Sequence, residues 1–263
     1  MIIDADSDFG RTLISPDNRL LAAPLKDGTI IVWDLQDDAM LHRFACQPST
    51  EPIAFLAQGT KLVTFERTGG SHDMWDLATG QPVQSWVGAA ELEWFLSPAF
   101  TPDERFMLTL RYWKAPGVLR DMTTGQQTYP HLDITETSGV SFSPKGEFLA
   151  ASSHVGYVKL WEVEAFRELA TLRGFLLGAH SVAFSPDGQR LAAGSDDQEA
   201  VKIWDVESLQ ELLTLPGQGR RLWRTEFSPD GDALATMSMA GGLNLWRAPS
   251  WEEIERAKAS LVR

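Results

Sequence analysis

SVAFSPDGQRLAAGSDDQEAVKIWD, residues 181–205, contains the strand and turn signals of one repeating unit. Short alternating segments separated by a Pro-Asp-Gly turn and a polar loop are typical of an antiparallel sheet. The turn at Ser185–Gly188 is favoured because Pro presets φ, Asp bonds its own backbone and Gly accepts a positive φ. The unit and the residues after it predict four strands, at Ser181–Phe184, Arg190–Ser195, Val201–Asp205 and Leu212–Leu215.

Two markers of this unit recur along the chain in one phase. Trp closes the third strand at positions 33, 75, 161, 204 and 246, at intervals of 42, 86, 43 and 42 residues. The double interval holds a degenerate copy in which Arg120 stands where Trp is expected. A Ser-Pro or Thr-Pro turn begins at residues 15, 101, 143, 185 and 228. A period of about 40–45 residues with a Trp-Asp ending is the signature of a propeller blade, so six repeats predict six blades.

The small residues of the second strand, Ala192–Ser195, predict close packing between neighbouring sheets. The third-strand tryptophans lie on the apolar phase of their strands. We therefore expect Trp33, Trp75, Trp161, Trp204 and Trp246 to be mostly buried between sheets.

These markers resemble the WD40-repeat family over nearly the whole chain. The resemblance implies an all-β, six-bladed WD40 β-propeller with a short C-terminal helix, forming a single domain over residues 1–263. The family often has a Gly-His pair before each inner strand, whose His joins a hydrogen-bonded network with the Trp. Here Phe175 and Gln218 occupy the His positions, so we expect the blades to pack by apolar contacts.

The two ends of the chain suggest how the ring closes. Ser250 is suited to cap a helix over residues 251–260, since acidic residues fill its first turn. The sixth repeat then has three strands, and the apolar Met1–Ile3 could supply the fourth. Alternatively, Ile2 and Ile3 belong to a preceding blade of a longer protein.

The ending at residues 245–254 resembles the C-terminus of propellers in large bacterial WD40-repeat proteins, some of which carry a serine/threonine kinase domain. The chain has no glycine-rich phosphate loop, His-Arg-Asp loop or Asp-Phe-Gly motif of a kinase. The resemblance therefore implies either the propeller part of such a protein or a free-standing relative.

The net charge of the chain disfavours some classes of binding partner. A net charge of -13 and a pI near 4.8 disfavour nucleic acid and anionic membrane surfaces as partners. Cys46 is the only cysteine, and the start of the chain has neither a basic segment nor an apolar run. We expect a monomeric cytoplasmic protein without a membrane segment.

The sequence predicts no catalytic, cofactor or metal site. The five histidines have no metal-ligand spacing, and a Gly-x-Ser-x-Gly nucleophile motif is absent. The adjacent acids Asp196 and Asp197 are interpreted as a solvated turn, because a calcium loop needs spaced carboxylates.

A ring of equivalent positions just before the inner strands is the predicted partner-binding surface. Alignment on Phe184 places Gly10, Glu51, Leu96, Ser138, His180 and Trp223 at this position. Next to it, three arginines surround Trp223 in an otherwise acidic chain, and Trp and Arg dominate interface hot spots. The predicted contact residues are Glu51, His180, Arg220, Arg221, Trp223 and Arg224. The alternative is that Trp223 packs on a neighbouring blade.

The leading functional hypothesis is a non-catalytic scaffold that binds a protein or peptide partner on this loop face. The second is a propeller that senses a small ligand or signal and regulates a serine/threonine kinase. The third, a hydrolase or lyase with its site in the channel, has little support because Glu51 and His180 are the only reactive residues in the ring.

Overall fold

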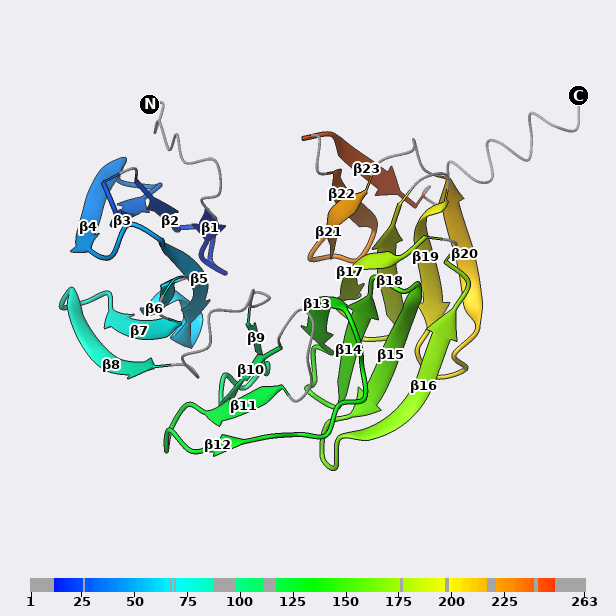
Figure 1. Ribbon diagram of the computed structural model, residues 1–263. Helices are drawn as coiled ribbons and strands as arrows, with labels where there is room; N and C mark the ends of the chain where they lie inside the picture. Colours follow the sequence, from blue (N-terminus) through cyan, green and yellow to red (C-terminus); the bar gives the residue numbers. More distant parts are fainter. Residues whose placement is uncertain are drawn as a thin grey trace, which may run out of the picture. The chain divides into compact units, whose positions relative to one another are not determined.

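The computed structural model describes residues 12–25, 27–66, 68, 70–87, 98–110, 117–175, 177–196, 199–216, 221–238 and 241–248. These residues form six antiparallel sheets, five with four strands and one with three (Figure 1). The six-bladed, all-β class predicted from the repeats is confirmed. The chain divides into two compact units, one within residues 1–97 and 122–125 and the other within 98–121 and 126–263. Whether they make one domain stays a prediction.

The first unit contains two four-stranded sheets. Their strands are β1 (Leu13–Ile14), β2 (Leu20–Pro24), β3 (Thr29–Asp34) and β4 (Ala39–Ala45), then β5 (Thr50–Leu56), β6 (Lys61–Glu66), β7 (Ser71–Asp76) and β8 (Gln81–Val87). A 3-10 turn at Ala57–Gly59 replaces the Ser-Pro-Asp turn in the second sheet. Each sheet runs in chain order, so every connection within it is a hairpin.

The second unit contains the other four sheets. They comprise β9 (Ala99–Phe100), β10 (Phe106–Thr109), β11 (Val118–Asp121) and β12 (Gln127–Thr128); β13 (Thr137–Phe142), β14 (Phe148–Ser153), β15 (Tyr157–Glu162) and β16 (Arg167–Arg173); β17 (Ala179–Phe184), β18 (Arg190–Ser195), β19 (Glu199–Asp205) and β20 (Glu211–Pro216); and β21 (Leu222–Phe227), β22 (Ala233–Ser238) and β23 (Leu243–Arg247). The four strands expected in residues 181–215 are all confirmed.

The Ser-Pro-Asp-Gly turn has the predicted chemistry. Ser185 Oγ donates to Asp187 Oδ1 at 2.5 Å and accepts from the Arg190 amide at 2.9 Å. Gly188 has a φ of +73°, a left-handed conformation that other residues rarely adopt. The turn therefore fixes where β17 ends and β18 begins.

Neighbouring inner strands of the second unit approach closely. Ser138 Oγ donates to the Ala179 carbonyl at 2.5 Å, joining β13 to β17. The Ser181 and Thr225 hydroxyl oxygens, 2.7 Å apart, join β17 to β21. A Cβ on Gly194 of β18 would lie 2.6 Å from Ser181 Oγ and 2.7 Å from Thr225 Oγ1. The expected role of small residues in close sheet packing is confirmed.

The expected burial of the five tryptophans is only partly correct. Trp161 and Trp204 are 1% and 3% exposed, whereas Trp33, Trp75 and Trp246 are half-buried. In the first unit the indole N–H groups turn toward polar partners: Trp33 donates to Asp38, and Trp75 to Thr64.

Trp246 has a different reason for its exposure. It lies on β23, the outermost described strand of the three-stranded sheet, where Leu243 and Leu245 are about 70% exposed. The three-stranded form of this sheet agrees with the sequence within the described residues. The helix expected over 251–260 and the pairing of Met1–Ile3 with β23 lie outside those residues and stay predictions.

In the degenerate third sheet, Arg120 is buried in β11 at the position of the missing tryptophan. Burial lowers the pKa of its guanidinium. The aliphatic part of an Arg side chain can lie in apolar surroundings, which is compatible with the burial of Arg120.

Replacing Trp204 by Ala should lower the free energy of unfolding by about 3–5 kcal/mol, as for other large aromatic truncations in a core. Trp204 packs edge-on against Phe175, with ring centroids 5.7 Å apart. Trp33→Ala is the matched control and should cost clearly less, because Trp33 is half-buried. Urea unfolding followed by circular dichroism measures both. Equal losses would mean that the Trp204 contacts are not those of a core.

Candidate functional site

The aligned ring position has one backbone geometry in three sheets of the second unit. Ser138, His180 and Trp223 are each the second residue of an inner strand, in β13, β17 and β21. At each of them the pairing register skips a residue, which marks a β-bulge. Bulges leave one residue unpaired and re-aim its side chain. The expectation that these residues precede the strands is therefore corrected.

Glu51 differs from these three residues. It is also the second residue of its strand, β5, but it pairs in register with Phe65, and the bulge comes later, between Pro52 and Ala54. Its residue is 8% exposed and lies in the first unit. The predicted role of Glu51 as a partner contact stays a prediction, for a residue that its strand largely buries.

His180 is buried in a polar network. It is 2% exposed, and its Nε2 lies 2.8 Å from Asp196 Oδ2. Asp196 Oδ1 in turn accepts from Arg221 Nε at 3.3 Å. Asp196 thus joins the bulge of β17 to the residue that precedes β21. The predicted role of His180 as a partner contact stays a prediction; in the structure its contact is with Asp196, which in turn accepts from Arg221.

His154 packs against His180, with ring centroids 4.4 Å apart. Its burial lowers the pKa of His154 to about 4, and the nearby His180 and Arg221 act in the same direction. Burial also lowers the pKa of His180, against the opposing effect of Asp196. Both imidazoles are therefore neutral at pH 7. In a neutral His180 that donates through Nε2, the Nδ1 atom is a buried acceptor without a hydrogen-bond partner among the described residues.

The arginines and Trp223 provide the accessible part of the site. Trp223 is 52% exposed, as a contact residue needs to be. The Arg221 side chain is 44% exposed beyond its contact with Asp196. Arg224 is ion-paired with Glu226 two residues along β21. Arg220 lies outside the described residues. The structure thus joins His180 to Arg221 through Asp196, and Trp223, in β21, follows Arg221 by two residues.

Sequence reasoning missed Asp196 and His154. The sequence predicts a solvated turn at Asp196, but its side chain is half-buried and contacts two other side chains. Asp196 becomes informative only once the register is known: β17 pairs with β18 so that Ala179 faces Ser195, which places Asp196 beside His180. His154 has no comparable local signal, because it reaches His180 from a different sheet.

Within the described part of the chain, no three His, Cys, Asp or Glu side chains are grouped as a metal site requires. Among the same residues, no helix is long and apolar enough to cross a membrane.

Comparison with known proteins connects these sheets to a family. Residues 126–162 and 166–205 match the family model described as WD domain, G-beta repeat. The chain is 29% identical over 126 residues to WD repeat-containing protein SL1-17 of Schistosoma mansoni, covering 48% of this chain and 41% of that protein. It is 25% identical over 197 residues to the guanine nucleotide-binding protein subunit beta of Oryza sativa subsp. japonica, covering 70% of this chain and 52% of the relative.

A third relative, periodic tryptophan protein 2 of Arabidopsis thaliana, is 24% identical over 199 residues, which are 72% of this chain and 21% of that protein. The chain thus spans about half or less of the length of these relatives. The matches support a WD40-repeat assignment, in agreement with the six sheets. The relatives named here are eukaryotic, so the bacterial, kinase-associated context stays a prediction.

The histidine pair makes stability depend on pH. Between about pH 6.5 and 4 the unfolded chain binds a proton at His154 that the folded chain does not, so stability falls as the pH falls through this window. We expect His154→Gln to make this decline shallower by about 1 kcal/mol, after allowance for solvent screening at a half-buried position.

Urea unfolding at a series of pH values between 7 and 4 measures the effect. His131→Gln, which alters an exposed histidine, is the control and should follow the parent protein. Parallel curves for His154→Gln and the parent protein would contradict the assignment of the decline to His154.

Proposed function

We propose that this protein is a non-catalytic module that binds a protein or peptide partner on the Trp223 surface, defined as Arg221, Trp223 and Arg224. The observation that supports this proposal is the half-exposed Trp223 between two arginines in a chain with a net charge of -13. Exposed Trp and Arg are the residue types that contribute most to interface affinity. Arg220 precedes this surface in the sequence and is included in the proposal.

The surface is organised before a partner binds. Arg221 is held by Asp196, and Asp196 is held by the buried His180. A side chain that is already ordered loses less conformational entropy on binding. The cations favour a partner segment with carboxylate groups, and the indole favours an apolar side chain beside them.

The relatives support binding in general terms. One of them is by name a subunit, so that protein works as part of an assembly. WD40-repeat proteins typically serve as interaction scaffolds, and we extend only that property to this chain. We further propose that the protein acts in the cytoplasm as a monomer and does not bind nucleic acid, on the basis of its acidity and its single cysteine.

The other hypotheses have less support. A hydrolase would need a nucleophile beside the His180–Asp196 pair, but the nearby Ser195 hydroxyl donates to the Gly178 carbonyl. Regulation of a serine/threonine kinase by a sensed ligand rests on the resemblance of residues 245–254 alone. Both hypotheses therefore have less support than partner binding.

The double variant Arg221→Ala and Trp223→Ala tests the proposal. In affinity capture from a lysate followed by mass spectrometry, it should lose the partners of the parent protein by about ten-fold or more, the loss expected for two hot-spot residues. Its melting temperature should stay nearly unchanged, because both side chains are about half exposed.

The matched control is Tyr129→Ala with Arg167→Ala, which removes another exposed aromatic residue and another exposed arginine. It should retain the partners. Undiminished capture by the Arg221 and Trp223 variant, or its unfolding, would contradict the proposal.

A further inference from the structure

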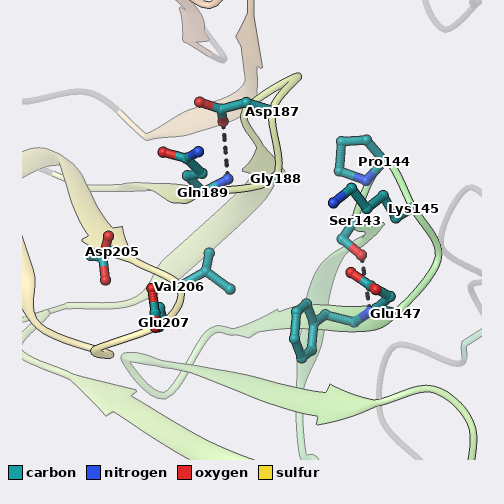
Figure 2. A pocket seen from close by; sticks show the side chains of 11 residues that line it. Ser143, Pro144, Lys145, Glu147, Asp187, Gly188, Gln189, Asp205, Val206 and Glu207 are labelled. Carbon is teal, nitrogen blue, oxygen red and sulfur yellow. Dashed lines mark hydrogen bonds between the residues drawn. The ribbon is translucent and has the colours of Figure 1, made fainter.

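A cavity of about 450 Å³ lies at the end of β17, whereas His180 lies at the start of this strand (Figure 2). Three turns line it: the one from β13 to β14, the one from β17 to β18 and the one from β19 to β20. His180 and Asp196 lie where β17 begins and β18 ends, whereas this cavity lies where β17 ends and β18 begins. It is therefore separate from the Trp223 surface.

The cavity is strongly acidic. Four carboxylates line it, against one lysine, Lys145; they belong to Glu147, Asp187, Asp205 and Glu207. Asp187 and Asp205 each use one oxygen, Oδ1, to accept the hydrogen bonds of their own turns. These bonds lower the pKa of both carboxyl groups, so both are ionised at neutral pH. The side chains of Glu147 and Glu207 make no hydrogen bond or ion pair with any described residue.

Ser143 adds a second, independent feature to the cavity. In four other repeats the turn hydroxyl donates to a carboxylate two residues later: Ser15 to Asp17, Thr101 to Asp103, Ser185 to Asp187, and Ser228 to Asp230. Lys145 occupies that position after Ser143 and offers no acceptor. Ser143 Oγ accepts from the Phe148 amide at 2.9 Å. Its own proton has no acceptor among the described residues.

The Ser143 hydroxyl belongs to a buried residue, since Ser143 is 2% exposed. Ser143 is nevertheless one of the residues that line the cavity. A buried donor without an acceptor is costly and is rarely retained without a partner. A ligand that combines a cationic group for the carboxylates with an acceptor for the Ser143 hydroxyl would satisfy both features of the cavity.

We propose that this cavity binds a basic peptide segment of a partner protein. An arginine or lysine side chain lies among the carboxylates of Asp187, Asp205 and Glu207, and a peptide carbonyl beside it accepts the Ser143 proton. The volume lies within the usual range for ligand pockets, about 300–1,000 Å³. A polyamine would satisfy the carboxylates but offers no carbonyl to Ser143, so the observations favour a peptide.

Isothermal titration calorimetry on the full chain tests the proposal. The probe is an end-blocked Gly-Gly-Arg-Gly-Gly peptide, and the control probe has citrulline, the neutral isostere, in place of arginine. We expect the arginine peptide to bind and the citrulline peptide to bind about ten-fold more weakly or not at all, because a charge-assisted contact is lost. Equal binding of the two peptides, or no binding of the arginine peptide at millimolar concentration, would overturn the proposal.

The Glu207→Gln variant should weaken binding of the arginine peptide about ten-fold. Glu164→Gln changes an exposed carboxylate that does not line the cavity, and it should bind as the parent protein does. Unchanged binding by Glu207→Gln would also overturn the proposal.

Two substitutions of Lys145 test the role of Ser143. Asn at position 145 removes the positive charge and supplies an acceptor where the other repeats have Asp. Its side-chain oxygen should accept the hydrogen bond of the Ser143 hydroxyl, which is then no longer available to the peptide. Peptide binding should therefore weaken about three-fold or more. Gln removes the same charge but is one methylene longer, so binding should be unchanged or tighter. Tighter binding by both variants, or spermidine binding as tightly as the peptide, would indicate a site for any cation and contradict the proposal.

The Arg221→Ala and Trp223→Ala variant should bind the arginine peptide normally. The peptide measurement and the capture experiment can therefore fail independently of each other.

Discussion

The close approach of neighbouring inner strands is the constraint on which the second unit depends. β13, β17 and β21 are joined by side-chain hydroxyl groups, from Ser138 to the Ala179 carbonyl and between Ser181 and Thr225. This spacing is possible only because Gly194 and its small neighbours leave room for those hydroxyls. The apolar clusters around Trp204 and around Leu222 form on either side of the same strands.

Both candidate binding regions follow from this packing, at opposite ends of the strands. At one end, the bulges of β17 and β21 place His180 inward and Trp223 outward, and Asp196 connects the two strands through Arg221. At the other end, neighbouring sheets bring their turns together around a cavity. The rigid turns there are the same elements that set the strand register.

The sequence predicts the fold well because its signals are local and repeated. Each turn is decided by a few adjacent residues, and Trp204 marks the third strand through simple alternation. The sites are harder to predict, because they depend on register and bulges. Alignment identified His180 and Trp223 as equivalent positions, but it could not show that one is buried and the other exposed. Asp196 and Ser143 become informative only through their neighbours in space.

Urea unfolding of Gly194→Ala tests the central claim most directly. In an extended strand, Ala is normally more stable than Gly by about 0.5–1 kcal/mol, because Gly loses more conformational freedom on folding. Here the added Cβ would meet Ser181, Thr225 and Leu222 within 3.0 Å. The account predicts a loss of about 1–3 kcal/mol in the free energy of unfolding, as for overpacked cores. An unchanged or increased stability would contradict it.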